Sequence, residues 1–155
     1  HNKKAVVYLS MGFGNPYGDE WSHELLEYWT EQLAERGVQM LSLADTIGIS
    51  SPDKIRYIFP HLTKQFPELE FGVHLHSAAT NWEEKIEAAY QSGCKRFDAA
   101  LKGYGGCPMA ADKLTGNIAT ENIIRYLKDQ GEGLKLDMDK WQEAMEYSSS
   151  VFVSS

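Results

Sequence analysis

One segment of the sequence places a thiol and a carboxamide close together. Residues 103–122 read GYGGCPMAADKLTGNIATEN, with Cys107 behind two adjacent glycines and Asn117 ten residues further on. Glycine adopts backbone conformations that a β-carbon forbids, and Pro108 stiffens the exit. We therefore expect the thiol on an exposed, sharply turned loop before a helix that starts near Thr120. An ordinary glycine-rich loop around a buried free cysteine is the alternative, and this segment alone does not exclude it.

Two histidines stand two positions apart in GVHLHS, residues 72–77. Side chains alternate between the two faces of a strand, so the imidazoles of His74 and His76 should lie on one face. Two neighbouring imidazoles are not both protonated without cost, and a shared divalent cation removes this conflict. The carboxamide oxygen of Asn117 is a candidate third ligand. The alternative is a pair of core histidines hydrogen-bonded to the backbone.

Carboxylates and a second cysteine complete the candidate residues. Asp45 ends the second expected strand in LADTIG, where it could be a catalytic or supporting carboxylate, or could tie down the loop through Thr46. Asp98 lies within the fourth expected strand, needs a partner for its charge and is interpreted as structural support. Glu121 either complements a helix N-terminus or lies close to the metal. Cys94 is expected to be inert core. The remaining histidines are assigned to the surface or to structural contacts: His1, His23 and His61.

The composition indicates one globular domain without a polyanionic partner. The chain has 155 residues, and its 15 basic and 22 acidic side chains give a net charge of −7. This charge argues against binding to nucleic acid or to an anionic membrane surface. No apolar run approaches the roughly 20 residues of a membrane span. The two cysteines are too few for a disulfide framework, so we expect reduced thiols in a cytoplasmic protein.

Four successive units, each a short apolar strand followed by an amphipathic helix, organise the chain. The expected strands span residues 5–11, 38–44, 71–76 and 95–101. The expected helices span residues 19–36, a segment from 51 onward, 81–92, 120–130 and a last one near 137–149. Such alternation predicts parallel strands joined by helical crossovers.

The loops favour a (β/α)8 barrel over a doubly wound sheet. No glycine-rich nucleotide-binding motif follows any expected strand, whereas long loops follow the strands, where barrel enzymes carry their chemistry. A complete barrel needs about 250 residues. Four units therefore predict an α/β fold that is half of a (β/α)8 barrel, with a C-terminal helix added. Two open sheet edges and one uncovered apolar face then predict association with another copy or with a missing half.

Taken together, these segments resemble the hydroxymethylglutaryl-CoA lyase family of metal-dependent lyase barrels. Four stretches carry the resemblance, at barrel strands five to eight: SMGFGNPYG, LSLADTIGIS, GVHLHS and FDAALKGYGGCPMAADKLTGNIATEN. Residues 1–155 would then be the C-terminal half of the catalytic domain, without its N-terminal half. The related isopropylmalate and homocitrate synthases share the histidine pair and the terminal Gly-Asn, but usually carry Glu-Arg where this chain has Cys107-Pro108. The cysteine therefore favours a lyase over a condensing synthase.

The resemblance implies cleavage of 3-hydroxy-3-methylglutaryl-CoA to acetyl-CoA and acetoacetate, or cleavage of a similar 3-hydroxyacyl-CoA. It implies that Mg²⁺ or Mn²⁺ is held by three side chains of this chain: His74, His76 and Asn117. It also implies four catalytic or cavity-lining residues: Cys107 on a mobile flap, His74 as a proton-transfer group, Asp45 and Glu121.

Two departures from the family pattern limit what this chain is expected to do. The family usually has an aspartate after the second histidine, where this sequence has Ser77. The family's fourth protein ligand is an aspartate on strand one, beside a catalytic arginine, and residues 1–155 resemble the family only from strand five onward. We therefore expect this chain alone to be an inactive half barrel that binds an acyl-CoA only in the intact protein.

Overall fold

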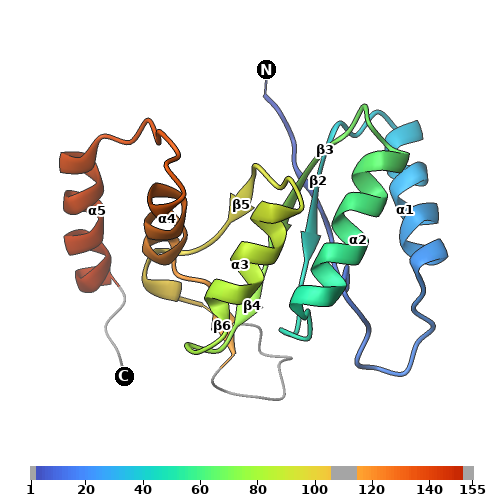
Figure 1. Cartoon of the computed structure of the whole chain (residues 1–155), viewed down its shortest axis with the longest axis horizontal. Coiled ribbons are helices and arrows are strands. Elements are labelled where there is room, and N and C mark those ends of the chain that lie inside the picture. The colour runs from blue at the N-terminus through green and yellow to red at the C-terminus, as the bar shows by residue number, and fades with distance from the viewer. Residues whose placement is uncertain (1–2, 106–114, 152–155) are drawn as a thin grey trace.

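The computed structural model describes residues 3–105 and 115–151, and its centre is a parallel sheet (Figure 1). Four strands lie in the order β1 (Val7–Leu9), β2 (Met40–Ala44), β3 (Glu70–His74) and β5 (Phe97–Asp98). The helices that connect them are α1 (His23–Glu35), α2 (Pro52–Gln65) and α3 (Trp82–Gln91). Two more helices follow, α4 (Thr120–Asp129) and α5 (Met138–Val151). The predicted α/β fold, with parallel strands in chain order, is confirmed.

Serine caps and a glycine turn set the helix boundaries. Ser22 Oγ accepts a hydrogen bond from Leu25 N at 3.1 Å, so α1 begins at His23, later than the predicted start near residue 19. Ser51 caps α2, and a proline occupies its first turn, as the sequence predicts. Gly37 follows α1 with a φ of +85°, which glycine adopts without strain, and so ends the helix.

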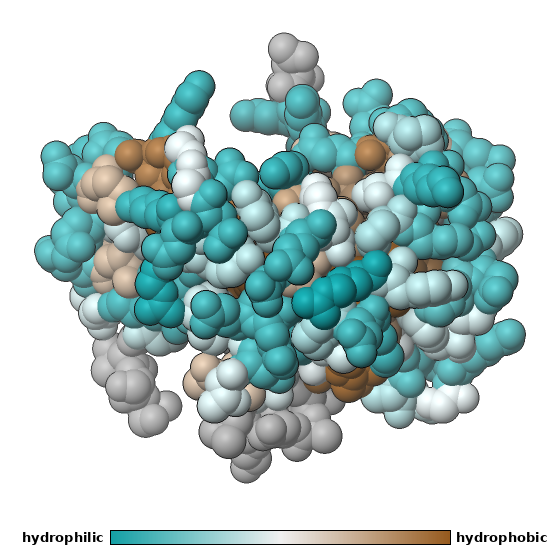
Figure 2. Space-filling model, in the orientation of Figure 1, coloured by the Kyte–Doolittle hydropathy of each residue, from teal (hydrophilic) through white to brown (hydrophobic). Residues whose placement is uncertain are grey.

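The apolar side chains of the sheet lie on the face that the helices cover. Leu41 and Leu43 of β2 and Val73 of β3 belong to one buried cluster with Ile55 and Phe59 of α2. Figure 1 shows α2 and α3 in front of this face of the sheet. The outer surface of these helices is mainly hydrophilic, with hydrophobic residues scattered singly or in small groups (Figure 2). This layer forms the core that holds the strand ends in place.

A substitution in α2 tests this core. Ile55 is 0% exposed, so Ile55→Ala is expected to lower the free energy of unfolding by about 2–5 kcal/mol, because transfer energy is lost and a cavity remains. Urea unfolding followed by circular dichroism measures the change. The same substitution at Ile49, which is 40% exposed, should cost less than about 1 kcal/mol. Equal losses at the two positions would contradict the packing described here.

The opposite face of the sheet is polar. Ser42 Oγ donates to Asp98 Oδ2 at 2.7 Å, and Arg96 donates to the same oxygen at 2.8 Å. Tyr8 lies on this face and is 46% exposed; burial, followed by the nearby charge of Asp98, raises the pKa of its phenol. Asp98 therefore has the partners that its position requires. The expectation of an apolar uncovered face is wrong at these positions, because the strands alternate apolar residues toward the helices with polar ones away from them.

The third predicted strand breaks before its second histidine. β3 ends at His74, and the next two residues form a short strand β4 (His76–Ser77). It pairs antiparallel with β6 (Gly116–Asn117), so His76 lies opposite Asn117. The fourth predicted strand is also shorter than expected, since residues 101–103 form the 3₁₀ turn η1 (Leu101–Gly103). The prediction that all strands are parallel thus holds for the main sheet and is wrong for this added pair.

No helix within the described residues is long and apolar enough to cross a membrane.

Candidate functional site

The two predicted histidines lie side by side at the carboxyl end of the sheet. Their ring centroids are 5.0 Å apart, with the ring planes at 72°. His74 Nδ1 lies 3.1 Å from the carbonyl oxygen of Asp98, and His76 Nδ1 lies 3.1 Å from that of Thr46. A carbonyl oxygen only accepts, so Nδ1 carries the proton in each ring. In a neutral imidazole the lone pair is then on Nε2, which is the usual arrangement of a metal-binding histidine.

Asn117 brings a third donor atom to the pair. Its Oδ1 lies 3.0 Å from His76 Nε2, and its Nδ2 donates to the carbonyl oxygen of Tyr104 at 2.9 Å, which defines how the amide is turned. A neutral His76 then presents a lone pair to the lone pairs of Asn117 Oδ1. Two acceptors at this distance repel each other unless a proton lies between them or both bind the same cation. The donor set therefore fits a divalent cation bound by two imidazoles and an amide oxygen.

Other metal-binding arrangements are lacking in the described part of the chain. Within residues 3–105 and 115–151, no group of three or more His, Cys, Asp or Glu side chains could hold a metal ion. A site at the histidine pair thus depends on the amide of Asn117. Cys107, the predicted proton donor, lies outside the described residues.

Asp45 lies in a buried hydrogen-bond network behind the histidines. Its Oδ1 accepts from Ser50 N at 3.0 Å, and its Oδ2 accepts from Ser50 Oγ and from Lys85 Nζ, the latter at 3.1 Å. The carboxylate does tie down its loop, but through Ser50; the hydroxyl of Thr46 instead accepts from Met11 N at 2.9 Å. The catalytic role of Asp45 stays a prediction, and in this structure both its oxygens are already bonded.

Lys85 was not predicted as part of the site. It is 1% exposed, in the middle of α3, where the neighbouring glutamates suggest a charged outer surface. A signal was nevertheless present, because Lys85 is three residues after Trp82 and four before Ala89, on the apolar stripe of an amphipathic helix. A lysine at such a position needs a buried acidic partner, and Asp45 is that partner.

Glu121 and Cys94 have structural contacts. Glu121 Oε2 accepts from Lys102 N at 3.0 Å and so stabilises the turn at Lys102, whose φ is +54°. Glu121 also lies in the first turn of α4, as the structural alternative expects, and an acid role near the metal stays a prediction. Cys94 is buried, and burial raises the pKa of its thiol to about 12, so its prediction as core is confirmed.

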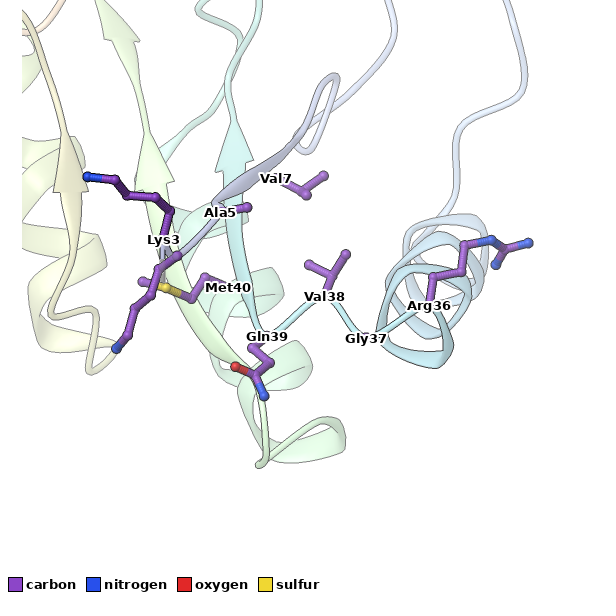
Figure 3. Close-up of a pocket in the computed structure, with 9 residues that line it drawn as sticks. Lys3, Ala5, Val7, Arg36, Gly37, Val38, Gln39 and Met40 are labelled. Atoms are coloured by element: carbon purple, nitrogen blue, oxygen red, sulfur yellow. The ribbon is translucent and has the colours of Figure 1, made fainter. Parts of the chain in front are cut away.

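A cavity of about 300 Å³ opens beside Asn117. Its lining combines the β4–β6 pair with the first turns of α3 and α4 and includes Ser77, Trp82, Lys102 and Gly116. A second cavity of similar volume lies at the other end of the sheet, around Lys3, Arg36 and Met40 (Figure 3). The reactive groups of parallel barrels gather at the carboxyl ends of the strands. The cavity beside Asn117 is therefore the candidate substrate-binding cavity.

Comparison with known proteins identifies the family of this chain. The family model described as HMGL-like matches residues 8–149, nearly the whole chain. The chain belongs to the HMGL-like family. Hydroxymethylglutaryl-CoA lyase of Bacillus subtilis is 32% identical over 146 residues, which cover 94% of this chain and 48% of the lyase. (R)-Citramalyl-CoA lyase of Chloroflexus aurantiacus is 29% identical over 145 residues, 94% of this chain and 45% of that protein.

Solved structures of the HMGL-like family have the same fold over this region. Hydroxymethylglutaryl-CoA lyase of Pseudomonas aeruginosa superimposes with a TM-score of 0.86 at 26% identity, over 98% of this chain and 50% of the lyase chain. The Bacillus subtilis lyase gives a TM-score of 0.85 at 31% identity, over 96% and 50%. The chain therefore spans about half the length of these relatives, and the prediction of half a (β/α)8 barrel is confirmed.

Proposed function

We propose that this chain forms the C-terminal half of the catalytic domain of a divalent-metal-dependent acyl-CoA lyase. The single observation that carries the proposal is the close approach of His76 Nε2 and Asn117 Oδ1, 3.0 Å apart with the ring of His74 beside them. Membership of the HMGL-like family and the names of the relatives support the lyase reaction. The proposed ion is Mg²⁺ or Mn²⁺, with further oxygen ligands supplied by the rest of the protein and by the substrate.

The reaction is the retro-Claisen cleavage of a 3-hydroxyacyl-CoA. The hydroxyl group loses its proton, its oxygen forms a carbonyl group with C3, and the bond between C2 and C3 breaks. The electron pair of the broken bond forms the enolate of acetyl-CoA, which then takes a proton at carbon. A bound metal ion would polarise the oxygens of the substrate and orient them. The carbonyl oxygen of Asp98 holds the Nδ1 proton of His74, which leaves Nε2 of that ring to bind the ion or to take a proton.

Cys107 is proposed to supply the proton to the enolate carbon. It follows two glycines in the segment that leads to Asn117, so the thiol and the amide ligand belong to one stretch of chain. Asp45 and Glu121 are proposed to support the same site through their hydrogen bonds. Asp45 bonds Lys85, and Glu121 holds the turn at Lys102. A separation of roles follows, in which the imidazoles bind the metal and the thiol acts on carbon.

The acyl group is proposed to be 3-hydroxy-3-methylglutaryl or a close relative. The two curated relatives described above cleave different acyl groups by their names, hydroxymethylglutaryl-CoA in one case and (R)-citramalyl-CoA in the other. Ser77, which lines the cavity beside Asn117, occupies the position where the resemblance leads us to expect an aspartate. The proposed substrate class is a CoA thioester with a hydroxyl group at C3 and a free carboxylate.

An assay on the full-length protein tests the proposal. With Mg²⁺ or Mn²⁺ present, 3-hydroxy-3-methylglutaryl-CoA and citramalyl-CoA should be offered separately, and free acetyl-CoA followed by mass spectrometry. We expect acetyl-CoA to appear from at least one thioester and the rate to fall to background with a chelator. Consumption of acetyl-CoA in the presence of a 2-keto acid, without cleavage of either thioester, would instead indicate a condensing synthase.

A further inference from the structure

The ammonium group of Lys85 uses all three of its protons inside the molecule. Nζ donates to Asp45 Oδ2 at 3.1 Å, to the carbonyl oxygen of Gly48 at 3.1 Å and to the carbonyl oxygen of His76 at 2.8 Å. The side chain of Lys85 is 2% exposed and that of Asp45 is 0% exposed. Three segments therefore meet at one buried charge: helix α3, the turn after β2 and the start of β4.

The contacts of Lys85 hold the two main-chain segments that orient the ring of His76. Its Nδ1 bonds the carbonyl oxygen of Thr46, and Thr46 lies between Asp45 and Gly48, the two residues of the turn that Lys85 bonds. Lys85 also bonds the main chain of His76 itself. The turn is closely packed at Gly48, which has a φ of +75° and where an added β-carbon would lie 2.3 Å from a methyl carbon of Thr115.

We propose that Lys85 is a positioning residue that sets the direction of His76 Nε2, by holding both the main chain of His76 and the turn that accepts its Nδ1 proton. This inference rests on the metal site proposed above, in which Nε2 is a ligand. Residues that hold a metal-binding histidine typically change metal affinity by about 10- to 100-fold when they are removed.

A purely electrostatic role for Lys85 is the competing explanation. Removing one partner of a buried ion pair leaves an uncompensated charge, which destabilises the fold wherever that pair lies. Lys85→Met removes the ammonium group and keeps most of the side-chain volume. Adding Asp45→Asn removes the charge that would be left, but it does not restore the bonds to Gly48 and His76. The single and double variants therefore separate compensation of charge from positioning.

The probe is Ni²⁺, which favours imidazole ligands and does not require a carboxylate. Its binding to the full-length protein is measured by calorimetry, together with the urea midpoint of each variant. We expect Lys85→Met and the double variant each to weaken Ni²⁺ binding about 10- to 100-fold, while the double variant recovers part of the lost stability. Lys64→Met, at an exposed lysine of α2, is the matched control and should change neither quantity.

Each other outcome overturns a defined claim. Wild-type Ni²⁺ affinity in the double variant would show that Lys85 only compensates Asp45, and would overturn the inference alone. Absence of Ni²⁺ binding to the unmodified chain would overturn the metal site and the inference together. If neither variant folds, an NMR titration of the unmodified chain with Zn²⁺ tests the inference. Zn²⁺ should shift the ¹⁵Nζ resonance of Lys85 but not that of Lys64. An unmoved Lys85 resonance would overturn the inference.

Discussion

Replacing His76 by alanine in the full-length protein is expected to abolish metal binding and acyl-CoA cleavage together. The substitution removes Nε2, the nitrogen that faces Asn117 Oδ1 at 3.0 Å. Loss of a ligand should cost more than loss of a residue that only supports one, so we expect metal affinity to fall by more than about 100-fold. Metal content after gel filtration and the rate of acetyl-CoA release measure the two effects.

Cys107→Ser should separate these two effects. The thiol is proposed to act on the enolate carbon, so metal content should stay near that of the unmodified protein while kcat falls by about 10²- to 10⁴-fold, the usual contribution of an acid or base group. His61→Ala is the matched histidine control, because His61 lies on α2 and bonds Glu27. It should leave metal content and turnover unchanged. Equal metal loss in His76→Ala and Cys107→Ser would contradict the assignment of roles.

Residues 1–155 by themselves are expected to bind Mg²⁺ only weakly and to cleave no acyl-CoA. The donors that this chain offers, two imidazoles and an amide oxygen, are all neutral when His74 and His76 carry one proton each. Hard cations need anionic oxygen ligands, so we expect a dissociation constant above about 1 mM for Mg²⁺. The resemblance to the lyase family predicts a further carboxylate ligand, and an arginine for the developing negative charge, in the other half of the barrel.

Calorimetry with Mg²⁺ checks the expected weak binding, and mass spectrometry of acetyl-CoA checks the expected lack of cleavage. The N-terminal half of the catalytic domain, added as a separate polypeptide, should restore part of both if the halves associate through their open sheet edges. Light scattering under the same conditions shows whether the chain associates with itself instead. Tight Mg²⁺ binding by residues 1–155 alone would overturn the argument from ligand charge.

The repeating features of this chain could be predicted from its sequence. Alternating apolar strands and amphipathic helices have clear periods, so the parallel sheet followed from them, as did the closeness of His74 and His76. The break at Leu75 and the antiparallel β4–β6 pair could not be predicted, because two-residue strands have no period and form only when distant segments meet. Helix starts could be predicted only in part. Ser51 and Pro52 correctly predicted the start of α2, whereas the predicted start of α1 was too early.

The contacts of the buried polar groups could be predicted least. Thr46 and Ser50 are both suited to bond Asp45, and only the path of the turn determines that Ser50 does so. The burial of Lys85 depends on the same turn. Asp98 was recognised as needing a partner, but its partners are Ser42 of β2, which lies two strands away in the sheet, and Arg96, which directly precedes β5. Tertiary packing determines which polar side chains bond each other. A single sequence shows only which residues are capable of such bonds.

The short β4–β6 pair has a consequence for substitutions at positions 106–114. Asn117 N donates to the carbonyl oxygen of Gly105 at 3.4 Å, and Gly116 pairs with Ser77. Gly105 and the residues of β6, which flank positions 106–114, are thus joined to each other and to the strand that carries His76. A loop between joined residues tolerates changes of length at a low entropic cost. Substitutions in this segment at positions other than Cys107 are therefore expected to leave the proposed ligands His76 and Asn117 facing each other.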